Sequence, residues 1–316
     1  MRQIVLCIYN VSKCFLFKNL LFDLPNAKVS KKRIGDKKVL DFLTDNRHNF
    51  ITLHSLHYLH NMTKLRFAGI IPARYASTRF PGKPLAILGG KAVIQRVYEK
   101  VADTLGEAYV ATDDKRIYDV VEAFGGRAVM TSPDHKSGTD RIEEAAEKIG
   151  CDCDVIVNIQ GDEPFIHASQ IEAICRCFDD EATEIATLGK PFGTDMDAIA
   201  NPNSPKIVVD NRGYAMYFSR SVIPYVRGCD MAVWAERFPF LKHIGVYAYR
   251  RNVLKAITSL SQSELEKAES LEQLRWLQNG YRIKVGITDI ETVGIDTPDD
   301  LRRAEQFLKE HDNFKS

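Results

Sequence analysis

Residues 67–84 read F-A-G-I-I-P-A-R-Y-A-S-T-R-F-P-G-K-P, an apolar run followed by a loop that carries three cations. The run 67–71 is short, uncharged and bounded by a proline, as is typical of a buried parallel strand. The prolines and the glycine after it exclude a regular helix, so Arg74, Arg79 and Lys83 lie on a constrained loop. Because guanidinium groups bind two phosphate oxygens at once, this loop is predicted to clamp a phosphate. A solvated basic turn is the alternative.

From Lys64 onward, segments with strand periodicity and helix periodicity alternate along the chain. The segment 155–159 is so apolar that both faces of this strand must be covered, which places it at the centre of a sheet. The alternation predicts a doubly wound, mostly parallel α/β sheet of Rossmann-like type, whose ligands bind beyond the carboxyl ends of the strands. We expect strands over 67–71, 108–111, 127–130 and 155–159, and helices over 92–105, 116–124 and 139–149.

Two familiar nucleotide-binding motifs are missing from the sequence. No G-x-G-x-x-G follows the first strand, so a dinucleotide-dependent oxidoreductase loses its main support, and no G-x-x-x-x-G-K-[ST] forms a P-loop. Side chains must therefore replace backbone amides as phosphate ligands. Gly89-Gly90-Lys91 resembles a fragment of a phosphate loop, but a tight turn before the next helix is the favoured interpretation.

The composition is that of an ordinary soluble globular protein, with 45% hydrophobic and 27% charged residues among 316. The 43 basic residues nearly balance the 42 acidic ones, which removes the charge excess that bulk binding to nucleic acid needs. We expect no nucleic-acid partner, no membrane insertion and a small anion as ligand. The seven cysteines, an odd number, do not suggest a disulfide framework, so we expect reduced thiols and a cytoplasmic location.

Residues 1–61 differ in composition from the remainder of the chain. They hold four of the eight histidines and a Lys-rich patch, and no periodicity joins them to the later pattern. The first residues imitate a signal peptide, but Asn10 and Lys13 interrupt the apolar stretch, so export is not expected. A metal site at the three histidines near the end of this segment is disfavoured, because no acidic or cysteine partner is near. We interpret 1–61 as an appended extension or a misassigned gene start, and 62–316 as the main domain.

A turn rich in carboxylates, Gln160-Gly161-Asp162-Glu163-Pro164, follows the central strand. The glycine permits an unusual backbone angle and the proline fixes the exit, so Asp162 is aimed over the sheet edge. Mg²⁺ prefers oxygen ligands, and one or two carboxylates typically hold it while it bridges substrate phosphates. Asp296, which precedes the N-cap Thr297 of the last helix, is the candidate second ligand.

Two junctions between a loop and a helix carry polar side chains. In Ser137-Gly138-Thr139-Asp140-Arg141 the donors could recognise a nucleobase edge, or Ser137 or Thr139 could cap the helix, and the two roles are compatible. Asp299 and Asp300 lie in the first turn of the last helix, where negative side chains complement the helix dipole. We therefore assign these two carboxylates to the helix and not to a metal.

The rhythm of strands and helices changes near 205–250. The segments 207–210 and 214–218 flank Asn211-Arg212-Gly213, a turn that joins neighbouring antiparallel strands. The change indicates a smaller inserted region of mixed α/β structure.

Taken together, these motifs resemble those of the 3-deoxy-manno-octulosonate (Kdo) cytidylyltransferases, over nearly all of the chain from Lys64 to Leu308. The resemblance implies a Mg²⁺-dependent transfer of CMP from CTP to Kdo, with release of pyrophosphate, for lipopolysaccharide biosynthesis. It also implies a nucleotidyltransferase fold over 62–316 and a homodimer formed with the help of the inserted region. The motifs that carry the resemblance are I-I-P-A-R-Y-A-S-T-R-F-P-G-K-P, S-G-T-D-R, V-N-I-Q-G-D-E-P, N-P-N-S-P-K, Y-F-S-R, H-I-G-V-Y-A-Y-R, L-E-Q-L-R and V-G-I-D-T-P-D-D.

The resemblance also implies roles for single residues. Asp162 and Asp296 would hold Mg²⁺, and Arg74, Lys83 and Asp162 would be catalytic. Three of the sugar residues have structural alternatives, because a histidine or tyrosine in a strand can belong to a packed wall and Glu272 can pair with Arg275 along a helix. The nucleotide would bind Ala73, Arg74, Arg79, Lys83, Ser137 and Gln160, and the sugar acid Arg220, His243, Tyr247, Glu272 and Gln273.

Three other functions fit part of the pattern. A cytidylyltransferase for another sugar acid would share the phosphate loop, and only the second half of the chain argues against it. A non-catalytic nucleotide sensor would have the pocket without turnover. A glycosyltransferase usually presents an Asp-x-Asp metal pair, but Asp152-Cys153-Asp154 precedes the central strand and so lies at its wrong end.

Overall fold

The computed structural model describes residues 65–291 and 294–310, and the compact unit of the chain begins at Leu65. The predictions for 1–61, including its histidines and its basic patch, lie outside the described residues. Within those residues, no helix is both long enough and apolar enough to cross a membrane.

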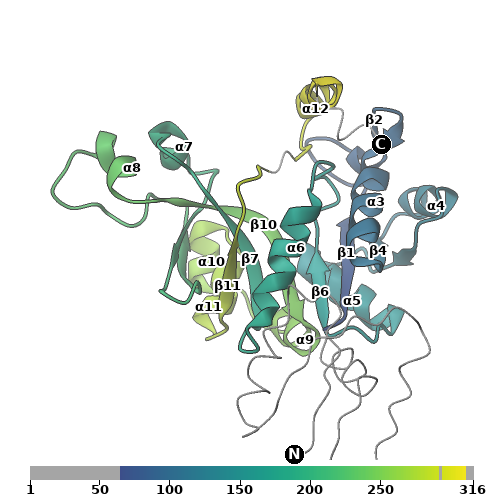
Figure 1. Ribbon diagram of the computed structural model, residues 1–316. Helices are drawn as coiled ribbons and strands as arrows, with labels where there is room; N and C mark the ends of the chain where they lie inside the picture. Colours follow the sequence, from purple (N-terminus) through teal and green to yellow (C-terminus); the bar gives the residue numbers. More distant parts are fainter. Residues whose placement is uncertain (1–64, 292–293, 311–316) are drawn as a thin grey trace, which may run out of the picture. The chain divides into compact units, whose positions relative to one another are not determined.

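A nine-stranded sheet forms the centre of the molecule, and its main path has the order β11-β7-β10-β6-β1-β4-β5 (Figure 1). The pairs β1–β4, β1–β6, β4–β5 and β7–β11 are parallel, whereas β10 runs antiparallel to both of its neighbours β6 and β7. The predicted mostly parallel, doubly wound sheet is confirmed. The strands are β1 (Phe67–Ala73), β4 (Ala108–Thr112), β5 (Ala128–Met130), β6 (Val155–Asn158), β7 (Ile185–Pro191), β8 (Lys206–Val209), β9 (Ala215–Ser219), β10 (Leu241–Arg250) and β11 (Ile283–Ile287).

Strand β1 runs two residues further than its sequence predicts, through Pro72 to Ala73. A proline in a central strand normally interrupts the ladder because it has no N–H to donate. Here the pairing of β1 with β6 stops at Ile70, while the pairing with β4 continues to Ala73. The proline therefore lies where β1 has a strand partner on one side only.

Helices cover both faces of the sheet. The helices α3 (Val93–Leu105), α4 (Lys115–Ala123) and α6 (Ala168–Arg176) bury their apolar residues on one face. The helices α5 (Gly138–Ile149), α9 (Arg251–Thr258) and α11 (Gln273–Gln278) do so on the other. The predicted helices 92–105, 116–124 and 139–149 are thus confirmed within one residue at each end. The remaining helices are α7 (Met196–Ala200), α8 (Trp234–Arg237), α10 (Glu264–Glu269) and α12 (Pro298–Glu310).

Two smaller apolar clusters extend the main core. Helix α12 packs Ala304 and Leu308 against Leu88 and Phe165, together with Ile295 from the segment before the helix. Gly89 and Gly90 join the short strands β2 (Ile87–Leu88) and β3 (Lys91–Ala92), so the tight-turn interpretation of this motif is correct.

The inserted region contains the predicted antiparallel hairpin. Strands β8 and β9 pair around the turn at 211–213, and β8 also pairs with the first residues of β10. Helices α7 and α8 lie on an arm that leaves the sheet at the upper left of Figure 1. Trp234 and Phe240 are buried in a separate apolar cluster there, with Ile199 of α7. Strand β10 carries the chain from this arm back into the central sheet.

The expectation of reduced thiols is wrong for one pair of cysteines. Cys151 and Cys153 form a disulfide just before β6. The odd cysteine count argues against a framework of long-range disulfides. It does not exclude a bond between two cysteines that are separated by a single residue. Cys175, Cys177 and Cys229 are free, and burial raises the pKa of Cys175 to about 12 and that of Cys177 to about 11.

Close packing of β1 on α3 requires Gly69. A Cβ atom at this position would lie 2.2 Å from Cγ1 of Val101, whose branched side chain has little rotamer freedom. We predict that Gly69→Ala lowers the free energy of unfolding by about 1–3 kcal/mol. Urea denaturation checks this through a lower midpoint at an unchanged slope. Gly245→Ala is the matched control, because no atom lies within 4 Å of its added Cβ; equal losses in the two variants would contradict the packing argument.

Candidate active site

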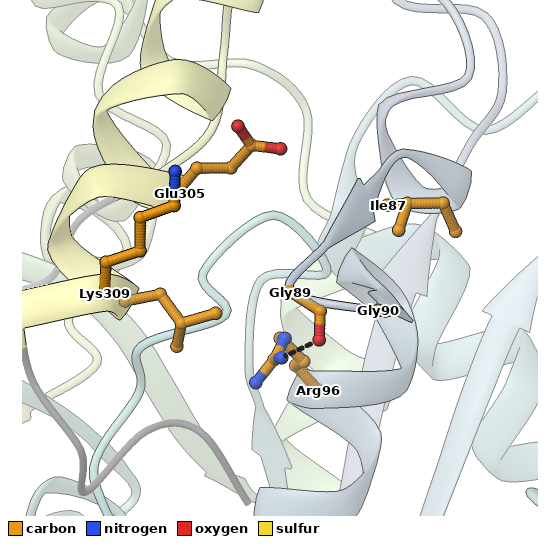
Figure 2. A pocket seen from close by; sticks show the side chains of 7 residues that line it. Ile87, Gly89, Gly90, Arg96, Glu305 and Lys309 are labelled. Atoms are coloured by element: carbon orange, nitrogen blue, oxygen red, sulfur yellow. Dashed lines mark hydrogen bonds between the residues drawn. The ribbon is translucent and has the colours of Figure 1, made fainter.

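Two cavities differ in the residues that line them. The larger, about 450 Å³, lies between the β2–β3 turn and the second half of α12 (Figure 2). The buried guanidinium of Arg96 donates hydrogen bonds to the carbonyls of Leu88 and Gly89 there, at 2.7 and 2.8 Å. None of the predicted site residues lines this cavity.

The smaller cavity, about 180 Å³, lies where β1 and β6 end at their carboxyl termini. Strand ends at this edge of a doubly wound sheet are the expected ligand site. The cavity brings together most of the residues assigned to the nucleotide, from four separate segments. Its predicted lining residues are Ala73, Arg74, Lys83, Ser137, Gln160 and Asp162.

The phosphate loop is closed by backbone hydrogen bonds at its base. The N–H groups of Ser77 and Gly82 both donate to the carbonyl of Tyr75, each at 2.9 Å. Gly82 has a φ of 73°, a left-handed conformation that favours glycine, and the chain then enters a single 3₁₀ turn at Lys83–Leu85. Because the loop returns on itself, Arg74 at its start and Lys83 at its end line the same cavity.

Four charged side chains meet beside this cavity. The ammonium of Lys83 donates to Asp162 and, at 3.0 Å, to Oδ1 of Asp296. Arg79 donates to Oδ2 of Asp296 at 2.9 Å. Burial lowers the pKa of Lys83, but the charges and hydrogen bonds of the two carboxylates outweigh this effect and leave the pKa above its usual value. The structure thus joins Asp162 and Asp296, which are far apart in sequence.

A backbone hydrogen bond and helix capping hold Asp296 in place. The N–H of Ile295 donates to the carbonyl of Asp162 at 2.8 Å. Asp300 accepts hydrogen bonds from the backbone N–H groups of Asp296 and Thr297, and Thr297 caps the N–H of Asp300. Asp300 therefore serves the helix start, as the sequence predicts.

The two carboxylates suit a hard cation. Since one ammonium reaches both Asp162 and Asp296, their oxygens are close enough to share a single ion. Mg²⁺ is commonly held by two carboxylates, with waters and phosphate oxygens as its other ligands. Throughout 65–291 and 294–310, no three His, Cys, Asp or Glu side chains gather as a complete metal site. A metal at this pair would need further ligands, such as waters or phosphate oxygens.

The Asp-x-Asp letters of a glycosyltransferase lie elsewhere. Asp152 and Asp154 precede β6 at its amino end, and both interact with Arg66. They are at the opposite end of this strand from Asp162, as the sequence predicts.

Ser137 is the N-cap of α5, with the reciprocal hydrogen bonds of a capping box to Asp140. The sequence analysis did not assign a role to His135, which also lines the cavity. Its Nε2 is hydrogen-bonded to Glu144, whose pKa is lowered to about 2 because hydrogen bonds from Lys148, the Ser132 N–H and His135 outweigh its burial. The sequence could have indicated His135 as a site residue through its position two residues before Ser137, on the same loop.

A second polar cluster begins beside the cavity, on the sheet face that α5 and α11 cover. The hydroxyl of Thr139, two residues after Ser137, donates to Glu272 at 2.7 Å. Burial raises the pKa of Glu272. Of the residues assigned to the sugar acid, Tyr247 is buried on this sheet face, and Gln273 is buried at the start of α11, next to Glu272.

Several buried polar atoms of this cluster lack a protein partner. Within the described parts of the chain, Nε2 of Gln273 has no partner, and Oδ1 of Asn158 and the hydroxyls of Tyr247 and Tyr249 have none at good hydrogen-bond geometry. Thr187 lies near the Tyr247 hydroxyl, and Asn158 and Thr139 lie near that of Tyr249, close enough to oppose slightly the rise in pKa that burial causes. Asn158 of β6 lies opposite Tyr247 of β10. Burial raises the pKa of both tyrosines well above the usual value, so both hydroxyls remain donors at neutral pH. Buried polar groups normally have a hydrogen-bond partner, so this cluster is suited to a polyhydroxylated ligand.

His243 and Arg220 have protein partners. The hydroxyl of Thr187 is 2.9 Å from the carbonyl of Val246 and 3.2 Å from Nε2 of His243. The hydroxyl can therefore donate its proton to the carbonyl and accept a hydrogen bond from the imidazole N–H. Burial lowers the pKa of His243 to about 3, and the ring is therefore neutral. The guanidinium of Arg220 donates to the carbonyls of Pro202, Glu269 and Ser270.

The alternative Glu272–Arg275 ion pair is not formed. Arg275 instead makes two hydrogen bonds of 2.7 Å to the carboxylate of Glu266, and both of these side chains are largely buried. Glu272 therefore makes no ion pair with Arg275 and accepts the hydrogen bond from Thr139 in the polar cluster.

Comparison with known proteins agrees with this geometry. Residues 68–284 match a family model described as cytidylyltransferase. The chain is 64% identical over 247 residues to a 3-deoxy-manno-octulosonate cytidylyltransferase of Bacteroides thetaiotaomicron, covering 78% of this chain and 99% of the relative. The enzyme of the same name from Cytophaga hutchinsonii is 52% identical over 244 residues, 76% of this chain and 97% of the relative.

A solved structure agrees with the sequence relatives. A CMP:2-keto-3-deoxy-manno-octonic acid synthetase, solved in complex with CTP, superimposes with a TM-score of 0.72 at 42% identity, over 78% of this chain and 99% of that one. With a matching family model, near-complete coverage of the relatives and the same fold, this chain belongs to the 3-deoxy-manno-octulosonate cytidylyltransferase family.

Proposed function

We propose that this protein transfers CMP from CTP to 3-deoxy-manno-octulosonate, forming CMP-Kdo and pyrophosphate. The observation that carries the proposal is the meeting of Lys83, Asp162 and Asp296 beside the cavity at the ends of β1 and β6. The family relationship supplies the substrates, because the relatives are named for this reaction and the solved structure holds CTP.

The nucleotide would lie along the 180 Å³ cavity. Arg74, Arg79 and Lys83 would bind the triphosphate, with the backbone near Ala73 against it. Two charges about 4 Å apart attract by roughly 4 kcal/mol at an effective dielectric constant near 20, so several cations offset the repulsion between two anionic substrates. Ser137 and Gln160, on neighbouring segments of the wall, would bind the cytosine.

Asp162 and Asp296 would hold Mg²⁺ at the phosphate end of the cavity. Mg²⁺ bound there would polarise the α-phosphate and lower the pKa of the attacking sugar hydroxyl. This chemistry requires no histidine base, which agrees with a neutral His243 that is bonded to Thr187.

The sugar acid would occupy the second polar cluster. Gln273 offers a donor without a protein partner, the Tyr247 hydroxyl offers one without a partner at good geometry, and the carboxylate of Glu272 can accept from a sugar hydroxyl. Asn158 and Tyr249, which the sequence analysis did not select, offer an acceptor and a donor in the same cluster. The family resemblance assigns Arg220 and His243 to the same site. With both substrates oriented, the anomeric hydroxyl attacks the α-phosphorus and pyrophosphate leaves.

We further propose a cytoplasmic homodimer whose product serves lipopolysaccharide biosynthesis. Tyr225 and Met231, on the arm that carries α8, are 75% and 41% exposed, and exposed apolar side chains favour contact with a second copy. Sedimentation of the full chain at micromolar concentration distinguishes a dimer from a monomer.

The reaction is tested by pyrophosphate release with CTP, Mg²⁺ and one acceptor at a time. Kdo should support turnover, and N-acetylneuraminate should support much less. Equal rates with the two sugar acids would indicate a cytidylyltransferase of broader scope. Tight binding of CTP with no pyrophosphate from either acceptor would indicate a nucleotide sensor.

Asp162→Asn tests the metal-binding role. We predict that kcat/KM for pyrophosphate release falls by about 10²-fold or more, because a preorganised charge that stabilises the transferring phosphate is lost. Asp152→Asn is the matched control, since its carboxylate is exposed at the opposite end of β6. Substantial activity in Asp162→Asn would remove Asp162 from the proposed metal site.

The low pKa of His243 predicts that the free energy of unfolding decreases in acid. The unfolded chain takes up a proton at His243 below about pH 6.5, whereas the folded chain does so only near pH 3. The folded state therefore loses stability as the pH falls through this window, and His243→Gln should remove about 2 kcal/mol of the loss between pH 7.5 and pH 5. Urea denaturation of both proteins at the two pH values measures this. Parallel pH dependences would show that His243 accepts a proton as readily in the folded chain as in the unfolded one.

A further inference from the structure

The ammonium of Lys83 lies between Asp162 and Asp296, where a metal cation would bind. Its ammonium bonds to both Asp162 and Asp296, and Arg79 bonds to the second of these carboxylates. Two cations and two carboxylates sum to zero charge. The side chain of Lys83 is 15% exposed, so water screens these contacts less than those of an open surface pair.

This balanced arrangement disfavours a free divalent ion. To reach both carboxylates, the ion must displace Lys83 and leave its ammonium without a partner in a largely buried position. The ion must also give up some of its waters, which Mg²⁺ does reluctantly. Across residues 65–291 and 294–310, no third His, Cys, Asp or Glu joins the pair to compensate for these costs.

A nucleotide triphosphate changes this balance. Its phosphate oxygens supply the ligands that the two carboxylates lack, and they also give Lys83 and Arg79 new anionic partners. Lys83 can make this exchange because it lines the cavity where the phosphates would lie. The ammonium is a compact point charge on a flexible stem, so it can move between partners without the planar fit that arginine requires.

We propose that Lys83 is an exchangeable counterion, which neutralises Asp162 and Asp296 in the free protein and passes to the nucleotide phosphates as the metal binds. Metal and nucleotide then bind with positive cooperativity, and each raises the affinity for the other by the same factor. This inference rests on the proposed function, because it assumes that the cavity accepts CTP and that the two carboxylates accept a divalent ion.

Calorimetric titration of the full chain with Mn²⁺ alone, CTP alone, and Mn²⁺ in the presence of CTP tests the proposal. Wild type should bind Mn²⁺ weakly when alone and at least about 10-fold more tightly with CTP present, within the usual range of coupling between sites. Lys83→Gln removes the competing charge, so it should bind Mn²⁺ alone about 10-fold more tightly than wild type and CTP more weakly.

Two further variants control for charge and for folding. Lys83→Arg keeps a cation beside the carboxylates and should bind Mn²⁺ alone as weakly as wild type. Lys115→Gln removes a lysine from an exposed pair with Asp119 on α4 and should leave every affinity unchanged. Urea denaturation establishes that each variant is folded before titration.

The outcomes separate this proposal from the proposed function. If folded Lys83→Gln binds Mn²⁺ alone no more tightly than wild type, the counterion role is wrong, even when wild type releases pyrophosphate from CTP and Kdo. If CTP leaves the Mn²⁺ affinity of wild type unchanged, the cooperativity is wrong. If wild type neither binds CTP nor releases pyrophosphate, the proposed function fails, and this inference fails with it.

Discussion

The charged cluster of Lys83, Asp162 and Asp296 depends on the hydrogen bond from the N–H of Ile295 to the carbonyl of Asp162. This bond fixes the segment before α12 against the turn after β6, and the burial of Ile295 beside Phe165 keeps water from competing for it. Asp296 follows Ile295 directly, so its carboxylate arrives beside Asp162 by backbone geometry. Two carboxylates this close repel each other, and Lys83 compensates for the repulsion. The charged cluster is thus a consequence of how α12 docks.

The polar cluster around Tyr247 depends on a different constraint, the antiparallel insertion of β10 between β6 and β7. Alternate residues of β10 lie on one face of the sheet, so Tyr247 and Tyr249 both pack against the Trp276 ring of α11 in T-shaped contacts. The same strand pairs with the β8–β9 hairpin at its other end. One long strand therefore connects the arm to the polar cluster beside the nucleotide cavity.

Local signals in the sequence predicted the first half of the fold well. Helix periodicity, glycine turns and capping residues are all encoded within a few positions, so the helices at 93–105 and 138–149 were expected almost to the residue. The antiparallel direction of β10 and the partners of Arg220 depend on contacts between distant segments, which periodicity does not encode. Asn158 and Tyr249 were not predicted as site residues for the same reason. Each belongs to a buried strand, and only the packed structure shows that their polar atoms lack partners at good hydrogen-bond geometry.

The nature of the two sites suggests where discrimination between substrates arises. Charge attraction at the proposed phosphate end would act on any nucleoside triphosphate, because cations contact phosphate oxygens without distinguishing the base or the acceptor. The proposed acceptor cluster consists of buried donors and acceptors together with the carboxylate of Glu272, and a substrate that leaves one of these groups unpaired would incur the full cost of its desolvation. A site built from such groups rejects analogues that lack a matching hydroxyl far more strongly than an apolar pocket does. If the substrates bind as proposed, selectivity for the sugar acid would reside in the hydrogen-bonding cluster around Tyr247, Glu272 and Gln273, and the charged loop would supply affinity.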